Sequence, residues 1–293
     1  MKSAVRLLVY FAAVVILGAL LAPILFWVAQ GLVQHGIFPK LAKFDFESFF
    51  HRALLIAAVV LLWPLLRSLN LKSLPDLDLE SNAHPWRNLV AGFILAAVPL
   101  LCCGAVLLAS HIFSVRVALN GSVVVRILGA TLAVPVVEEL FFRGLILGIL
   151  LRSGRTYLAV VITSALYSIV HFLKAPERTT TVVSWSSGFH SIANSFSQFG
   201  NPLLLGASFA TLFLIGWILA DARLRTRSLW LPIGLHGGWI FGNGLFNKLA
   251  HRQAMALPWL GQNLLVGLVP IGLACLTWLI MLGWLKYAWS DQK

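Results

Sequence analysis

Residues 7–39 read LLVYFAAVVILGALLAPILFWVAQGLVQHGIFP, and this stretch contains no Asp, Glu, Lys or Arg. A helix needs about 20 predominantly apolar residues to cross the hydrocarbon core of a bilayer. Three more stretches lack these charged residues in the same way: 88–115, 228–247 and 253–285. The sequence therefore predicts a polytopic membrane protein built from helices, because a helix satisfies its backbone hydrogen bonds within one lipid-exposed segment.

The composition excludes the common classes of soluble protein. Of 293 residues, 59% are hydrophobic and 11% are charged, and the mean hydropathy is +0.89. Soluble domains have about 45–50% apolar and about 25% charged residues, so a secreted enzyme, a DNA-binding domain and a disordered chain are excluded. The net charge is +12. In a membrane protein, Lys and Arg gather in the loops and set the orientation of the chain, so the positive charge does not indicate a nucleic-acid partner and none is expected.

The alternation of apolar and charged segments predicts an all-α fold, a polytopic membrane helical bundle with about eight transmembrane helices. We expect residues 1–293 to form a single integral membrane domain. The second apolar segment is short, so seven spans remain the alternative. The eight segments are 7–30, 53–68, 88–114, 122–150, 157–174, 202–220, 228–248 and 262–287.

The distribution of basic residues predicts the orientation of the chain. With eight spans and both termini inside, 12 Lys and Arg residues fall in inner loops and ends, and 8 fall in outer loops. This excess predicts that both termini are cytoplasmic. The first apolar segment is longer than that of a signal peptide and has no A-x-A site near its end, so we expect an uncleaved helix.

The segment 182–199 carries large apolar residues at helical spacing. Steps of four, three, four and three residues separate Trp185, Phe189, Ile192, Phe196 and Phe199. Polar side chains fall on the other faces, so we predict an amphipathic helix that lies in the membrane interface. Such a helix is either a connector on the surface or a lid that docks the substrate.

Two adjacent acidic residues, Glu138 and Glu139, lie deep in an apolar segment that reads VPVVEELFFRG at 134–144. Charged residues there cost about 2.5–3.5 kcal/mol to insert, so they should face the bundle interior or a water-filled cavity. Glu139 and Arg143 are four residues apart and can pair on one helix face, as a structural clamp. Glu138 points about 100° away, which leaves it for chemistry. Pro135 removes a helix hydrogen bond and predicts a kink beside the carboxylates.

Two histidines lie in later apolar segments, His171 in 157–174 and His236 in 228–248. A rise of about 1.5 Å per residue places Glu138 and His171 about 20 Å from the same membrane face, and His236 about 12 Å from it. We therefore expect the three side chains to meet in the bundle. The segment around His236 is rich in glycine, which indicates either close helix approach or a backbone deformed around a cavity.

The order of these residues resembles a known family. An EExxxR motif at 138–143 is followed by an aromatic-x-x-x-His motif at 167–171 and later by His236. The combination is similar to the CPBP family, the intramembrane CAAX-processing and bacteriocin-processing endopeptidases, also called the Abi family. The resemblance covers about residues 120–250, which we expect to contain the catalytic helices.

The resemblance implies a glutamate-dependent protease that requires no metal cofactor. In such an enzyme Glu138 and His171 activate a water for attack on a peptide carbonyl, and His236 stabilises the oxyanion. Glu139 and Arg143 would hold the site together. A zinc site built from the Glu and His side chains is the alternative, although the HExxH motif is absent.

The chain departs from the family pattern at two positions. Tyr167 stands where the family usually has Phe, and Ile240 stands where it usually has Asn, four residues after the histidine. Asn243 shares a helix face with His236 but lies about 10.5 Å further along. The oxyanion donor is therefore Asn243 reached through a distorted helix, the indole N–H of Trp239, or His236 alone.

We expect an intramembrane endopeptidase that hydrolyses a peptide bond of a membrane-associated protein or peptide in the lipid bilayer. The resemblance implies a prokaryotic plasma membrane, and it leaves the substrate open among prenylated CAAX proteins, leader peptides, sorting tails and membrane anchors. One alternative is an ion- or proton-coupled carrier that uses the buried Glu and His side chains as a proton relay. Another is a catalytically inactive partner or regulator of the same family.

Overall fold

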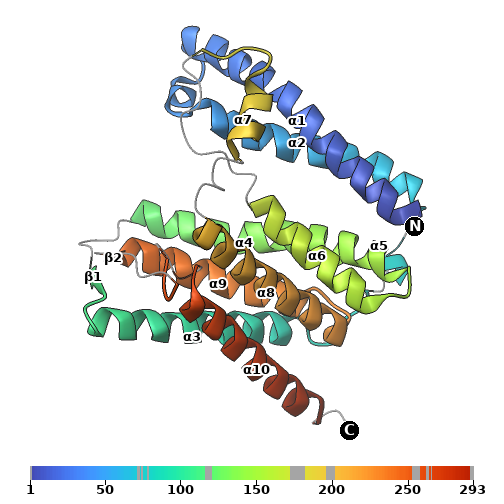
Figure 1. Ribbon diagram of the computed structural model, residues 1–293, viewed down its shortest axis with the longest axis vertical. Helices are drawn as coiled ribbons and strands as arrows, with labels where there is room; N and C mark the ends of the chain where they lie inside the picture. The colour runs from blue at the N-terminus through green and yellow to red at the C-terminus, as the bar shows by residue number, and fades with distance from the viewer. Residues whose placement is uncertain are drawn as a thin grey trace. The chain divides into compact units, whose positions relative to one another are not determined.

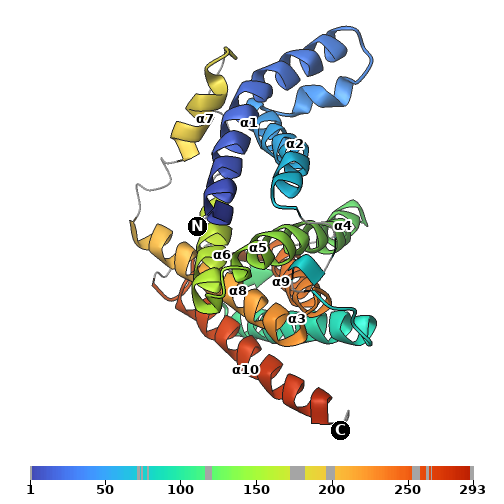
Figure 2. The same cartoon turned by 90° about the vertical axis from the view of Figure 1, so that its right-hand side faces the viewer.

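The computed structural model is largely helical and divides into two compact units (Figures 1 and 2). One unit is formed by Met1–Lys72 with Ile169–Asn201, and the other by Ser73–Ser168 with Pro202–Lys293. The structure describes residues 2–70, 73, 75–77, 79–115, 121–171, 182–195, 202–252, 258–261, 264 and 266–290.

The first unit is built on two long helices. α1 (Lys2–Gln34) and α2 (Phe46–Ser68) are joined through a short 3₁₀ helix, η1 (Pro39–Lys43). Asp45 caps α2, because its carboxylate accepts a hydrogen bond of 3.1 Å from the backbone N–H of Ser48. The core between the helices consists of Ala19, Ala22, Phe46, Phe50 and Ala53.

α7 (Ser187–Ser195) packs on this pair of helices through small side chains. Its buried residues are Ser187, Gly188, Ser191 and Ser195. A Cβ atom on Gly188 would collide with the backbone of Ala19, so α7 and α1 are in close contact. Phe189 of α7 is 41% exposed, and the ring of Trp185, just before the helix, meets that of Trp27 on α1 edge to face with centroids 4.8 Å apart.

A helix is present over 187–195, inside the segment 182–199 predicted to be amphipathic. Its serines are buried, Ile192 packs against the core of α1 and α2, and Phe189 and His190 are exposed. Phe196 and Phe199 lie outside the described residues, and the location of the helix at the membrane interface stays a prediction.

The second unit contains the candidate site. Its helices are α3 (Pro85–Ala109), α4 (Gly121–Glu139), α5 (Leu147–Leu151), α6 (Thr156–His171), α8 (Pro202–Thr226), α9 (Trp230–Leu249) and α10 (Leu268–Ser290). The division between the units falls inside α6, between Ser168 and Ile169.

Four short elements complete this unit. A 3₁₀ helix, η2 (Pro75–Leu77), precedes α3, and a π-helix, η3 (Leu140–Ile146), joins α4 to α5. Two strands, β1 (Phe113–Val115) and β2 (Ala250–Arg252), form an antiparallel ribbon with Phe113 opposite Arg252.

The helical membrane architecture predicted from the apolar segments is confirmed. Each of the eight segments coincides with one helix or, for 122–150, with the continuous run of α4, η3 and α5. Among the described residues, the helices long and apolar enough to cross a membrane are α1, α2, α3, α8 and α10. α6 is apolar but has 16 residues, fewer than the roughly 20 that a perpendicular span requires.

α3 and α9 pack closely because glycines line their contact. A Cβ atom on Gly92 of α3 would lie 2.6 Å from the carbonyl oxygen of Leu231, and Cβ atoms on Gly234 and Gly238 of α9 would collide with the α3 backbone. α9 is one continuous α-helix, so its glycines serve close helix approach and do not deform the backbone around a cavity. This contact positions His236, which α9 carries.

Candidate active site

The two adjacent glutamates lie where α4 changes into a π-helix. Glu138 and Glu139 are the last residues of α4, and η3 begins at the next residue. The backbone N–H of Leu147 bonds to the carbonyl of Phe142, five residues earlier, as a π-turn requires. Pro135 lies inside α4, which continues as an α-helix to Glu139, so the kink expected from this proline stays a prediction. The irregularity that the structure shows is the π-helix that begins at Leu140. Such insertions are frequent at functional sites.

The predicted pair between Glu139 and Arg143 is present and fully buried. Nη1 of Arg143 donates to Oε1 of Glu139 at 2.9 Å, and neither side chain is exposed. Nη2 of Arg143 donates to the main-chain carbonyl of Gly216 on α8 at 3.1 Å. The guanidinium also lies 4.4 Å from the ring centroid of Tyr167 on α6. Arg143 therefore connects three helical elements, and removing it would strand a buried carboxylate.

Gly216 was not singled out by the sequence, although the arginine depends on it. A Cβ atom at Gly216 would lie 3.1 Å from Cα of Ser164, closer than most Cβ contacts in proteins, so α6 or α8 would have to shift slightly. The glycine lets α8 approach α6 closely enough to present its carbonyl to Arg143. A glycine within an apolar span is the signal that could have indicated this contact.

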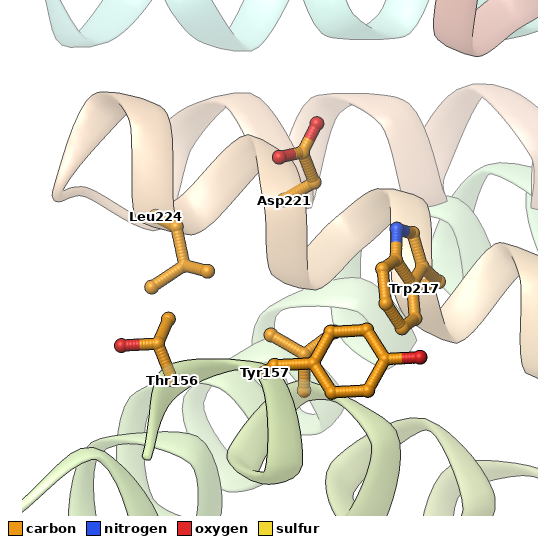
Figure 3. A pocket seen from close by; sticks show the side chains of 6 residues that line it. Thr156, Tyr157, Trp217, Asp221 and Leu224 are labelled. Atoms are coloured by element: carbon orange, nitrogen blue, oxygen red, sulfur yellow. The ribbon is translucent and has the colours of Figure 1, made fainter. Parts of the chain in front are cut away.

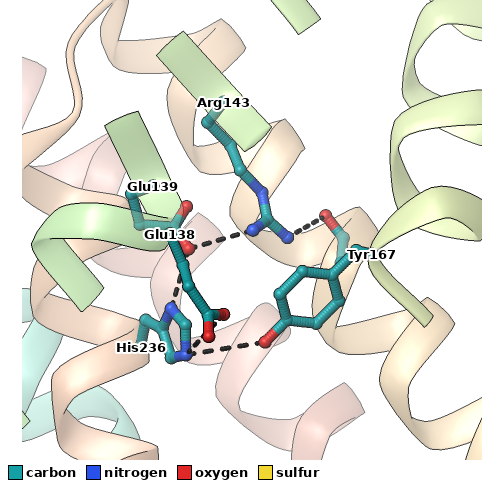
Figure 4. Close-up of polar contacts among 6 residues, drawn as sticks. Glu138, Glu139, Arg143, Tyr167 and His236 are labelled. Atoms are coloured by element: carbon teal, nitrogen blue, oxygen red, sulfur yellow. Dashed lines mark hydrogen bonds and ion pairs between the residues drawn. The ribbon is translucent and has the colours of Figure 1, made fainter. Parts of the chain in front are cut away.

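His236 binds the same glutamate from α9. Its Nδ1 lies 2.8 Å from Oε1 of Glu139, the oxygen that also accepts from Arg143 (Figure 4). Oε1 of Glu139 is an acceptor in its bond to Arg143, so we assign the hydrogen of this second bond to Nδ1. The imidazole is thereby fixed in orientation, with Nε2 directed away from Glu139.

The Nε2 edge of His236 faces Glu138 and Tyr167. Nε2 lies 3.8 Å from Oε2 of Glu138 and 3.5 Å from the hydroxyl oxygen of Tyr167 (Figure 4). The side chain of Glu138 is 27% exposed, whereas that of Glu139 is completely buried. The imidazole therefore lies between the fully buried, arginine-bound carboxylate of Glu139 and the carboxylate of Glu138, whose side chain is partly exposed although its Oε2 is buried.

The structure brings together Glu138, Glu139, Arg143, Tyr167 and His236. His171 is the last residue of α6 and is half-buried, one turn after Tyr167 on the same helix face. It belongs to the other compact unit, so its predicted action together with Glu138 stays a prediction.

The two alternative oxyanion donors on α9 have different surroundings. Asn243 is two turns beyond His236 in a continuous helix, and its side-chain oxygen accepts from the amide of Asn247 at 3.1 Å. The structure therefore does not bring Asn243 into the cluster. Trp239 is buried three residues after His236, and its role as a donor stays a prediction.

A separate cavity of about 350 Å³ lies between α6 and α8 (Figure 3). Its lining residues are Thr156, Tyr157, Val160, Trp217, Asp221 and Leu224. None of them belongs to the carboxylate cluster.

The region that holds the cluster is similar to a known protease family. Residues 120–242 match the family model described as Rce1-like type II CAAX prenyl endopeptidase. No curated protein and no solved structure shows significant similarity to the chain. The resemblance inferred from the glutamate and histidine motifs is thereby confirmed. Over residues 120–242, this multi-pass membrane protein is similar to the Rce1-like type II CAAX prenyl endopeptidases.

Proposed function

We propose that the protein is an intramembrane endopeptidase in which Glu138 is the general base for attack of water on a peptide carbonyl. The observation that carries this proposal is the position of Glu138, a partly exposed carboxylate 3.8 Å from the buried imidazole of His236. A base that must exchange protons with water has to be reachable, and its partner has to be held in place. The match to an endopeptidase family supports this assignment.

In the proposed reaction, the Glu138 carboxylate passes one proton from the attacking water to the leaving nitrogen. Glu138 takes a proton from water, and the resulting hydroxide adds to the carbonyl carbon of the scissile bond. The protonated Glu138 then gives its proton to the leaving nitrogen as the C–N bond breaks, which regenerates the carboxylate. By the family resemblance, His171 helps to orient the water at the first step.

Glu139 and Arg143 act on this reaction through His236. The buried ion pair between them fixes the carboxylate that in turn holds Nδ1 of the imidazole. His236 is therefore already oriented with Nε2 toward Glu138 before the reaction begins, so its orientation adds nothing to the activation free energy. No metal ion is required for any of these steps.

The proposed substrate is a membrane-associated protein or peptide, because the site lies among membrane-spanning helices. Because the matched family is described as a CAAX prenyl endopeptidase, the first substrate to test is a prenylated peptide that ends in a CAAX sequence. The protein is reconstituted in liposomes and incubated with a prenylated peptide that ends in a CAAX sequence, and products are identified by mass spectrometry.

A truncated peptide that forms with the intact protein, and not with empty liposomes, supports the endopeptidase. If this peptide is not cut, membrane peptides from cells with and without the protein are compared by the same method. Absence of any truncated peptide in both assays, together with protein-dependent proton flux into sealed liposomes, would replace the protease by a carrier.

A further inference from the structure

The surroundings of His236 restrict which group can stabilise an oxyanion. Its Nδ1–H is committed to Glu139 at 2.8 Å. In the neutral imidazole, Nε2 is then an acceptor and has no hydrogen to donate. In the imidazolium, the Nε2–H faces the Glu138 carboxylate at 3.8 Å, an opposite charge that attracts it. In both states His236 is a poor independent donor to a developing oxyanion.

The hydroxyl group of Tyr167 is a second possible hydrogen-bond donor beside Nε2 of His236. The hydroxyl oxygen lies 3.5 Å from Nε2 of His236, longer than a strong O–H···N hydrogen bond. An O–H group turns about its C–O bond, so it can redirect its hydrogen to a nearby oxygen that becomes negative. The phenol side chain is buried, where one such donor has a large effect.

The position of the Tyr167 ring is fixed by its neighbours. The guanidinium of Arg143 lies 4.4 Å from the ring centroid. The ring of Phe142 meets it edge to face, with centroids 5.2 Å apart and planes at 83°.

We propose that Tyr167 is a catalytic residue whose hydroxyl donates to the oxyanion formed at the carbonyl that Glu138-activated water attacks. This inference rests on the proposed peptidase function and assigns its oxyanion donor. The next turn of α9 supports the assignment, because residue 240, on the same helix face as His236, is Ile and offers no donor.

The test compares Tyr167→Phe with Tyr157→Phe in the reconstituted cleavage assay. Tyr167→Phe removes one oxygen atom and keeps the ring contacts, so the protein should stay folded. We expect kcat to fall by about 10²–10³ with KM unchanged within about twofold, because the contact forms in the transition state. Tyr157 is on the same helix, 73% exposed and outside the cluster, and its Phe variant should match the parent protein.

Ile240→Asn supplies the matched rescue. In the Tyr167→Phe background, an amide at residue 240 should recover at least a tenth of the lost turnover, whereas a merely structural tyrosine would not be rescued. In the parent protein the same substitution should change kcat by less than about threefold, since a donor is already present. This second comparison remains informative if Tyr167→Phe lowers the yield of folded protein.

Two results would overturn the inference. One is unchanged kcat in folded Tyr167→Phe, and the other is a tenfold or greater rise in kcat from Ile240→Asn alone, which would mean that no donor existed before. Both require a parent protein that cleaves peptide. A parent protein without cleavage contradicts the proposed function, so the two failures are distinguishable.

Discussion

Oε1 of Glu139 lies 2.8 Å from Nδ1 of His236, a residue 97 positions later in the chain. The same oxygen accepts from Arg143 at 2.9 Å. One buried carboxylate oxygen thus joins the end of α4, the π-helix and the middle of α9. The two adjacent glutamates therefore differ in their surroundings, since Glu139 is fully buried and bound to Arg143 and His236, whereas the side chain of Glu138 is 27% exposed.

Glu138→Gln should abolish cleavage and leave the protein folded. The amide has nearly the shape of the carboxylate, but it cannot accept a proton from water at neutral pH. Glu80→Gln is the matched control, because Glu80 pairs with Arg227 at the surface and is 58% exposed. Cleavage rates and unfolding midpoints of both variants are measured in the same liposomes or detergent. Full activity of folded Glu138→Gln would refute the assignment of the base.

Arg143→Ala should destabilise the protein far more than Arg225→Ala. Both arginines pair with a carboxylate four residues earlier, but the Arg143 pair is completely buried and Arg225 is 48% exposed. Breaking a buried pair costs about 3–5 kcal/mol, whereas an exposed pair contributes about 0–1 kcal/mol. Thermal unfolding in detergent measures the difference, and equal midpoints for the two variants would contradict the buried clamp.

Gly234→Ala should lower the stability of the second unit, while Gly129→Ala should not. A Cβ atom at residue 234 collides with the backbone of Leu89, whereas residue 129 has open space around it. Overpacking costs about 1–3 kcal/mol, and alanine is the better helix former at an open position. Unfolding midpoints of the two variants decide whether glycine is required at the contact of α3 and α9.

His236→Ala should lower turnover by about 10²–10³, because Nε2 of the imidazole lies beside Glu138, where the transition state is proposed to form. Asn243→Ala should leave turnover nearly unchanged. Asn243 lies two turns beyond His236 on the continuous α9, and its side chain is hydrogen-bonded to Asn247. The two variants are compared for kcat and KM with one peptide. A loss in Asn243→Ala as large as that in His236→Ala would mean that α9 unwinds when substrate binds.

Strong chelation should leave activity unchanged. In the part of the chain that the structure describes, no group of three or more His, Cys, Asp or Glu side chains is arranged to hold a metal ion. Activity and metal content are measured before and after treatment with a chelator. A metalloprotease would be indicated instead if the protein contains stoichiometric zinc, if chelation removes both the zinc and the activity, and if added zinc restores the activity.

The sequence by itself determined the membrane architecture and the local half of the site. Long apolar segments predict helices because lipid leaves the backbone no other way to satisfy its hydrogen bonds. The pair of Glu139 with Arg143 was also predictable, since four residues place two side chains on one helix face. The different directions of the two glutamate side chains also follow from the angle between adjacent helical residues.

Only the tertiary structure decided how the distant residues meet. The bond from His236 to Glu139, the carbonyl of Gly216 at Arg143 and the hydroxyl of Tyr167 at His236 each join different elements. Their helices approach through glycines, and periodicity within one helix does not report which neighbour it packs against or at what rotation. For the same reason, the serine face of α7 could be recognised as polar, but its burial against α1 and α2 depended on the shape of those helices.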